Sequence, residues 1–323
     1  MPEMQSYMGV NEGNSGIIGK LLYYSTANIL IPKDRFIELG KAFNLPKVKP
    51  ARESAASAYR YATTALKDRV VNKDAGGTHI YRIYCRDNKQ DTSSVICREL
   101  VKETLDSTTN NYKKLANIAF KRETEEMFYD NTEYDPEIDA AQYCEQALTL
   151  FERFKSCYNS DHVDSVVQLL LEKMQAVKIN IHSNLYFIPN PHLPLLNIFE
   201  DYIEALSKCN LNAGNVSSNS MFVANDEKQR EKMTAEFYMN YKRDIETYEE
   251  RIQHFIDNGC SSAAVINRWL KKIEALKAKK ATYEQVLKRR LDDLDKDFSL
   301  LQMQSQELSL RAVKNQMEMP LAA

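Results

Sequence analysis

The chain lacks the features that mark membrane, disulfide-stapled and zinc-binding proteins. No run of 18 consecutive apolar residues occurs, so we expect no membrane span. The six cysteines include no C-x-x-C pair, and 323 residues bury enough core to make disulfide staples unnecessary. The five histidines form neither H-E-x-x-H nor a Cys/His quartet. The first residues also lack the basic and apolar segments of a signal peptide. We therefore expect a cytoplasmic protein without a metal or cofactor.

An excess of charge of one sign is also lacking. The chain has 43 Lys and Arg residues against 45 Asp and Glu residues, and its formal net charge is −2. This balance argues against a protein that coats nucleic acid through bulk charge, and leaves a local basic patch as the alternative. With 27% charged and 43% hydrophobic residues, the composition is that of a globular protein. The length is typical of about two domains.

Catalytic motifs are missing as well. Gly16 and Gly19 precede Lys20, but a Walker loop would need glycine where Asn14 stands and Ser or Thr where Leu21 stands. The acids between positions 123 and 139 lack the central glycine of a calcium loop, and no G-x-S-x-G sequence occurs. The chain is therefore expected not to be an enzyme. A hydrolase whose site is assembled from distant residues remains an alternative.

Strand and helix patterns alternate along the first two-thirds of the chain. A β-branched and aromatic run at 17–31 predicts strands, and three segments at 78–86, 94–105 and 112–121 predict an antiparallel meander. Helical patterns follow, and the polar stretch after position 209 predicts a linker. The fold class expected is α+β, an antiparallel sheet with packed helices followed by a long antiparallel helical hairpin (coiled coil). The expected boundaries are a flexible N-terminus at 1–16, an α+β domain at 17–208, a linker at 209–224, the hairpin at 225–311 and a tail at 312–323.

The last third of the chain has a heptad pattern of apolar residues. From Ile266 to Leu308, apolar residues recur every three or four positions, with one extra residue between Leu287 and Leu291. This spacing predicts a coiled-coil seam with a single stutter. A similar seam precedes it at about 226–258, and Gly259 lies between the two. A glycine after a helical pattern predicts a helix stop, so the two arms are expected to fold back antiparallel.

The two arms of this predicted hairpin differ in length. At about 1.5 Å per residue, the first arm spans about 50 Å and a second arm at 262–310 about 73 Å. The unmatched end of the second arm would hold apolar side chains whose exposure forfeits about 1.5–3 kcal/mol each. We therefore predict docking on the α+β domain, on a second copy or on a foreign protein, and expect a homo-oligomer that also binds a protein partner. The candidate interface residues are Leu294, Phe298, Leu301 and Leu308.

A basic stretch on the second arm is the basis of an alternative function. Between positions 268 and 290 the chain has nine basic residues and two acidic ones, and more acids follow directly. Such a stretch binds phosphates in a salt-sensitive manner. The competing interpretation is that these residues pair with acids of the other arm or of another chain. The candidate nucleic-acid contacts are Arg268, Lys271, Lys272, Lys279, Lys280, Lys288, Arg289 and Arg290.

The first two-thirds of the chain also resemble a known family. The resemblance is carried by LLYYSTANILIPKDRFIELGKAFNLP, ARESAASAYRYAT, HIYRIYCRD with VICRELVKET, and NLYFIPNPH. Over about residues 17–205, these segments are similar to an uncharacterised family of bacteriophages and integrative mobile elements. The resemblance implies a setting in a bacterial cytoplasm and brings no functional residues with it. In that setting, inhibition of a host defence system is a natural use for an interaction protein.

Overall fold

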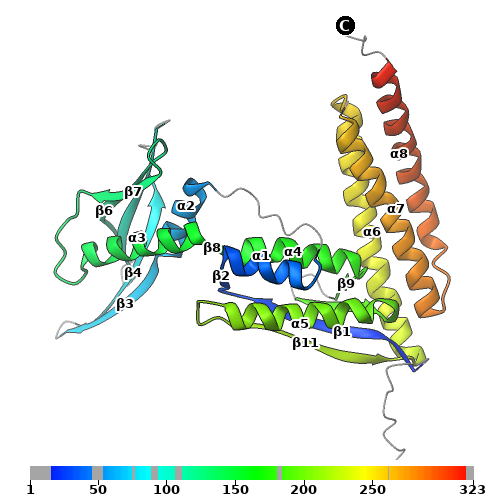
Figure 1. Ribbon diagram of the computed structural model, residues 1–323, viewed down its shortest axis with the longest axis horizontal. Helices are drawn as coiled ribbons and strands as arrows, with labels where there is room; N and C mark the ends of the chain where they lie inside the picture. The colour runs from blue at the N-terminus through cyan, green and yellow to red at the C-terminus, as the bar shows by residue number, and fades with distance from the viewer. Residues whose placement is uncertain are drawn as a thin grey trace, which may run out of the picture. The chain divides into compact units, whose positions relative to one another are not determined.

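The computed structural model describes residues 16–45, 54–74, 77–88, 94–105, 111–179, 184–260 and 262–317 (Figure 1). These residues form antiparallel sheets and long helices, which confirms the predicted α+β class. The chain divides into two compact units. The meander unit consists of Asn28–Val166 and Lys208–Gly214. The sheet–bundle unit consists of Met1–Ala27, Val167–Ser207 and Asn215–Ala323.

This division differs from the boundaries predicted at 17–208 and 225–311. The first strand belongs to the same unit as the C-terminal helices, and the meander unit is inserted between them in the sequence. The predicted boundary followed the change from mixed to heptad composition. Composition does not reveal which distant segments pair, and pairing is what defines a compact unit.

The meander unit is built on a five-stranded antiparallel sheet whose strands follow one another in chain order. The three central strands include the predicted meander and confirm it. Helices α2 (Ala55–Ala65) and α3 (Ala140–Ser156) pack on one face, where Phe120 lies between Tyr59 and Phe151 with ring centroids 5.6 and 5.9 Å away. The strands are β3 (Lys67–Asp74), β4 (Gly77–Asp87), β5 (Val95–Thr104), β6 (Asn111–Lys121) and β7 (Glu126–Asp130).

Short elements complete the meander unit. Strand β2 (Leu30–Pro32) pairs with β8 (Cys157–Asn159), and α1 (Lys33–Ala42) follows β2 directly. Pro32 precedes the first helical residue of α1, where a fixed φ and a missing N–H do no harm. Helix α4 (Ser160–Lys173) leads from this unit into the sheet–bundle unit.

The sheet of the sheet–bundle unit has the antiparallel order β11-β1-β10-β9. Helix α5 (Leu193–Cys209) contacts one face, where the Tyr24 ring lies 5.8 Å from that of Phe199. On the other face Phe187 packs into the core of the C-terminal helices. The strands are β1 (Ile17–Thr26), β9 (Val177–Lys178), β10 (Leu185–Pro189) and β11 (Val216–Ala224); the 3-10 turn η1 (Asn190–His192) links β10 to α5.

Gly19 has a structural role within this sheet. It pairs with Pro189 in the centre of the sheet, where a Cβ would lie 2.1 Å from the Ile188 carbonyl oxygen and 2.8 Å from the Phe187 ring. No other residue fits this approach without displacing the neighbouring strand. The glycine therefore serves sheet packing, and Lys20, which follows it, lies in a strand and not at the start of a helix.

The predicted linker at 209–224 contains strand β11. Val216 to Ala224 pair with β1 along its whole length, and Val216 and Val223 are buried. Its polar centre, with no apolar period, has the composition of a loop. It forms a strand because β1, some 200 residues earlier in the sequence, offers a free edge whose N–H and C=O groups require partners.

The C-terminal third forms three helices and not two. They are α6 (Glu227–Asp257), α7 (Ala263–Leu287) and α8 (Asp293–Met317), and α8 returns alongside α6 (Figure 1). Asp226 caps α6 by accepting a hydrogen bond from the Gln229 N–H at 2.8 Å. The predicted antiparallel fold-back at Gly259 is present, and this glycine has φ +60°.

The predicted long second arm is wrong, because the chain reverses where a stutter was expected. Helix α7 ends at Leu287, and Lys288 adopts the left-handed conformation with φ 53°. The Leu291 N–H then donates to the Glu284 carboxylate at 2.9 Å, which holds the turn against the end of α7. The C-terminal third is therefore a three-helix bundle, and no part of the predicted second arm is left without a packing partner among the described helices.

Candidate interaction surface

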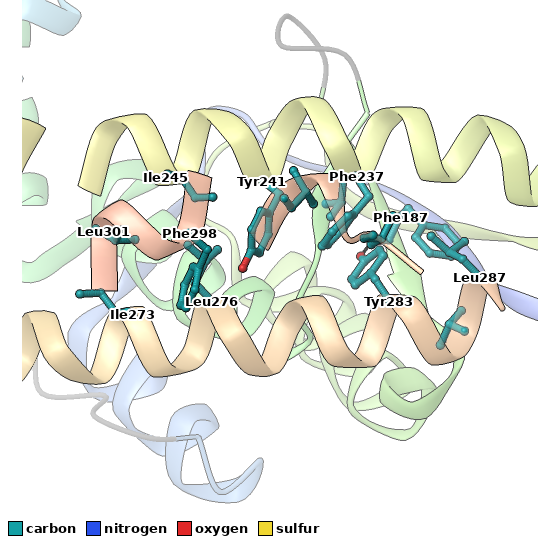
Figure 2. Close-up of a cluster of buried hydrophobic side chains, with 14 of the residues drawn as sticks. Phe187, Phe237, Tyr241, Ile245, Ile273, Leu276, Tyr283, Leu287, Phe298 and Leu301 are labelled. Carbon is teal, nitrogen blue, oxygen red and sulfur yellow. Dashed lines mark hydrogen bonds between the residues drawn. The ribbon is translucent and has the colours of Figure 1, made fainter. Parts of the chain in front are cut away.

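The predicted interface residues lie inside the bundle. Leu294, Leu301 and Leu308 are at most 1% exposed and Phe298 is 8% exposed, all within one apolar core. Figure 2 shows Phe298 and Leu301 of α8 directed toward Ile273 and Leu276 of α7. The partner that the sequence required for these side chains is the chain's own α6 and α7. An interface through them would require the bundle to open.

An aromatic cluster joins the bundle to its sheet. The Tyr283 ring of α7 stacks on Phe237 of α6 at 4.2 Å and contacts Phe187 of β10 edge-on at 6.0 Å (Figure 2). The Tyr283 hydroxyl donates to the Gln175 carbonyl oxygen at 2.9 Å. Burial raises the pKa of this hydroxyl well above its ordinary value. Tyr283 is a seam position in the heptads, but nothing in the sequence indicated that its hydroxyl binds a distant backbone.

The basic stretch is largely neutralised by acids of the same unit. Lys280 lies 2.6 Å from the Asp295 carboxylate and 3.3 Å from that of Glu284. Lys279 lies 3.8 Å from Asp244. In the remaining pairs, Arg289 contacts Glu227 and Arg290 lies 3.9 Å from Asp292. These ion pairs correspond to the competing interpretation, in which the basic residues pair with acids of the neighbouring helices.

Burial and pairing act together on these lysines. Burial lowers the pKa of Lys279, and the Asp244 carboxylate opposes this effect. Lys280 is also subject to burial, but hydrogen bonds to Asp295 and Glu284 raise its pKa overall. Both lysines are therefore engaged with carboxylates of the bundle itself. Lys272 instead lies over the Trp269 ring, 4.8 Å from its centroid.

Three of the eight predicted nucleic-acid contacts are exposed without a described ion pair. Arg268 and Lys271 lie one turn apart on α7, and Lys288 lies at its end. Two cations one turn apart and a third some five turns away form a sparse phosphate-binding surface. The structure therefore does not gather the basic stretch into one patch.

A groove runs between α7 and α8. Its volume is about 460 Å³, and its floor is apolar, with Ile273 and Phe298 nearly buried. Its described lining contains no histidine or cysteine, so no nucleophile–base pair of the serine or cysteine hydrolase type lies in it. The lining residues are Leu270, Ile273, Glu274, Lys277, Phe298, Gln302, Ser305, Gln306, Ser309 and Leu310.

The outer face of α8 beside this groove is poor in charge. From Ser299 to Leu310, Glu307 is the single charged residue in a chain that is 27% charged overall. Leu300, Met303 and Leu310 are 47%, 60% and 72% exposed. They follow helical spacing on the side away from the bundle core. An exposed apolar stripe of this kind next to a groove is typical of a surface that binds another helix.

The acids between 123 and 139 serve the meander unit. Asp135 accepts from Lys102 and Lys113, each at 3.0 Å, and Glu137 lies 2.5 Å from Lys102. Burial alone would raise the pKa of Asp135, but these hydrogen bonds lower it to about 2. The ammonium of Lys102 also lies 3.9 Å from the Tyr81 ring centroid. Two of the clustered acids are thus partners of lysines.

The described residues form no metal-binding cluster: no group of three or more His, Cys, Asp or Glu side chains among them is arranged to hold a metal ion. None of the helices described combines the length and the apolar character that crossing a membrane requires. All six cysteines have free thiols.

Comparison with known proteins and protein families gives the following findings. No curated protein and no solved structure matches the chain significantly. The model of the Family of unknown function DUF6744 matches residues 17–314. The match begins at β1 and continues into α8, so it includes residues of the bundle and of the described sheets. The chain therefore belongs to the Family of unknown function DUF6744.

Proposed function

We propose that this protein is a non-enzymatic interaction protein, which self-associates and binds a protein partner through the groove between α7 and α8. The observation that carries the proposal is the partly apolar outer face of α8, where Glu307 is the single charged residue between Ser299 and Leu310. Solvent-facing helix surfaces ordinarily bear charged residues, and Leu300, Met303 and Leu310 stand where such residues are expected. Exposed apolar area of this kind is a driving force for association.

The occupant proposed for the groove is an amphipathic helix of the partner. Helices α7 and α8 supply two ridges, and a third helix laid between them would cover the half-buried Leu270 and the exposed Leu310, above a floor of Ile273 and Phe298. The α8 wall offers Gln302, Gln306 and Ser309 as uncharged hydrogen-bonding groups, and the α7 wall adds Glu274 and Lys277. A partner helix with an apolar centre and polar or charged residues on the side toward α7 fits this lining.

The setting proposed is a bacteriophage or mobile element in a bacterial cytoplasm. It is supported by the segments of residues 17–205 that resemble a family of such elements. Within this setting, the partner would be a host protein and the outcome the inhibition of a host defence system. The groove and the setting are independent, so one can fail without the other.

Charge placed on the apolar stripe of α8, at the margin of the groove, provides the test. Met303→Glu combined with Leu310→Glu, called the groove variant, puts two carboxylates on this stripe. Met239→Glu combined with Asn267→Glu is the matched control, because both positions are exposed and neither lines the groove. Tagged wild type and both variants are used to capture proteins from a bacterial host lysate, followed by quantitative mass spectrometry. We expect a protein enriched with the wild type and the control to fall at least tenfold with the groove variant. Equal capture by all three proteins would contradict binding in the groove.

A further inference from the structure

Strand β11 is an unprotected sheet edge. Among the described strands it pairs with β1 alone, and in Figure 1 it borders its sheet. Its nine residues, VSSNSMFVA, include no charge and no proline. Met221 is 61% exposed and Phe222 is 43% exposed. The outer row of backbone N–H and C=O groups on such a strand is a template for another strand.

The other described edge strands are short or charged, and both features prevent such pairing. Strand β9, at the opposite edge of the same sheet, has two residues. Strand β3 has charges at five of its eight positions, KDRVVNKD, and β7 has five residues bounded by Glu126 and Asp130. Short and charged edges resist association. The contrast within one molecule marks β11 as an edge that is left open for pairing.

From this contrast we propose that β11 pairs antiparallel with β11 of a second copy, which joins two four-stranded sheets into one of eight strands. The second copy is favoured because the strand is compatible with itself. Two-fold pairing places each residue opposite a residue of the same strand, so self-pairing meets no charge repulsion where the strand has no charged residue. This edge has none. The inference rests on the proposed self-association and identifies β11 as the surface through which it occurs.

The pairing register is restricted by symmetry. With a two-fold axis perpendicular to the sheet, residues that lie opposite one another share a face and have the same parity. Centring the pair on Ser220 overlaps all nine residues and places Asn219 opposite Met221. Ser218 then lies opposite Phe222, which already carries Lys20 above its ring at 4.7 Å. Each exposed apolar side chain thus gains a cross-strand neighbour.

The dimer would carry both bundles on one side. An axis perpendicular to the sheet leaves each face on its own side, so the face that packs on the bundle through Val223 and Phe187 is shared by both copies. The two α7–α8 grooves would then be presented together. Two grooves on one side bind a dimeric partner with a higher effective concentration than a single groove does.

Charge substitutions on the strand test the pairing. Asn219→Lys with Met221→Lys places lysines at two exposed positions, so that with the pair centred on Ser220 each lysine faces a lysine of the other copy. The matched control, Asn267→Lys with Met239→Lys, adds the same charges at exposed sites of α7 and α6. Light scattering should give a dimer mass for wild type, for the control and for the groove variant, and half that mass for the strand variant. A mixture of the lysine variant with Asn219→Glu, Met221→Glu should restore the dimer mass as a mixed pair.

A second measurement uses the unmodified protein. Hydrogen exchange of the β11 amides should slow with rising protein concentration, whereas exchange in β3, the charged edge, should not change. A monomeric wild type, or a lysine variant that keeps the dimer mass, would overturn the pairing. A foreign strand on this edge would appear as slowed exchange that requires added lysate. Equal capture by wild type and the groove variant, with an intact dimer, would instead count against the groove, so the two proposals fail separately.

Discussion

Single residues in this protein are held by partners far away in the sequence. Asp135 illustrates this most fully, since its carboxylate accepts from Lys102 and Lys113 and also from the backbone N–H groups of Glu137 and Ile138. Its side chain is 3% exposed. A buried carboxylate that accepts several charge-assisted hydrogen bonds strongly favours its ionised form.

Removal of this charge should destabilise the meander unit in a pH-dependent way. The folded pKa of Asp135 is about 2, below the ordinary 3.8, so its contribution is complete above the unfolded value and is lost as pH falls through the folded value. Asp135→Asn should lower the free energy of unfolding by about 2 kcal/mol at pH 7, and the difference should shrink between about pH 4 and pH 2. Urea unfolding followed by circular dichroism across this range measures it.

Glu123→Gln is the control for this prediction, because Glu123 is an exposed carboxylate of the same acidic segment. It should change stability by less than about 0.5 kcal/mol at every pH. An Asp135→Asn deficit that stays constant down to pH 2 would show that the hydrogen-bond geometry matters and the charge does not.

At the scale of elements, the turn between α7 and α8 decides the form of the C-terminal third. The basic run of Lys288, Arg289 and Arg290 ends one helix, and Asp292, Asp293 and Asp295 begin the next. Basic residues favour helix C-termini and acidic residues favour N-termini, because of the helix dipole. In the sequence, these charges were interpreted as basic and acidic stretches on one continuous helix. In the structure, they mark the end of α7 and the start of α8.

The left-handed residue in this turn gives a prediction that distinguishes a helix break at Lys288 from a continuous helix. The two differ in the sign of the change in the free energy of unfolding. Lys288 has φ 53°, a region that is strained for residues with a Cβ. Lys288→Gly should raise the free energy of unfolding by about 0.5–1 kcal/mol. In a continuous helix the same change would lower it by about 1 kcal/mol. Thermal and urea unfolding measure the difference, and Gln285→Gly inside α7 provides the destabilising reference.

At the scale of the whole molecule, the two units differ in how local their construction is. The meander unit is built from strands and helices that adjoin in sequence, and the meander was accordingly predicted from alternation and turn residues. The sheet–bundle unit joins β1 to β11 and to helices more than 200 residues later. Local patterns contain no information on such pairing, so the predicted domain boundary differs from the compact units, and the segment predicted as a linker at 209–224 contains β11.

Truncation after Leu287 tests the role of α8 in the whole molecule. As an unmatched end, the segment from 294 onward would be removable without loss of the fold. In the bundle, its removal takes away Leu294, Phe298, Leu301 and Leu308, each worth about 1.5–3 kcal/mol when buried. Their sum is comparable to the stability of a whole domain, about 5–15 kcal/mol. We expect the truncated protein to bind a hydrophobic dye and lose the cooperative unfolding of its bundle helices.

The amino-acid sequence by itself determined the heptad seams, the fold-back at Gly259 and the meander. These follow from side-chain periodicity and turn chemistry, which act within a few residues. Only the tertiary structure decided that α8 turns back, that β11 joins β1, and that the basic stretch is paired. The reason is energetic: a helix stop and a stutter at 288–292 differ locally by about 1 kcal/mol, whereas burying α8 against α6 and α7 is worth several times more. The apolar seam of α8 packs on α6 and α7 of its own chain, and the outer face of α8 and the edge of β11 remain exposed.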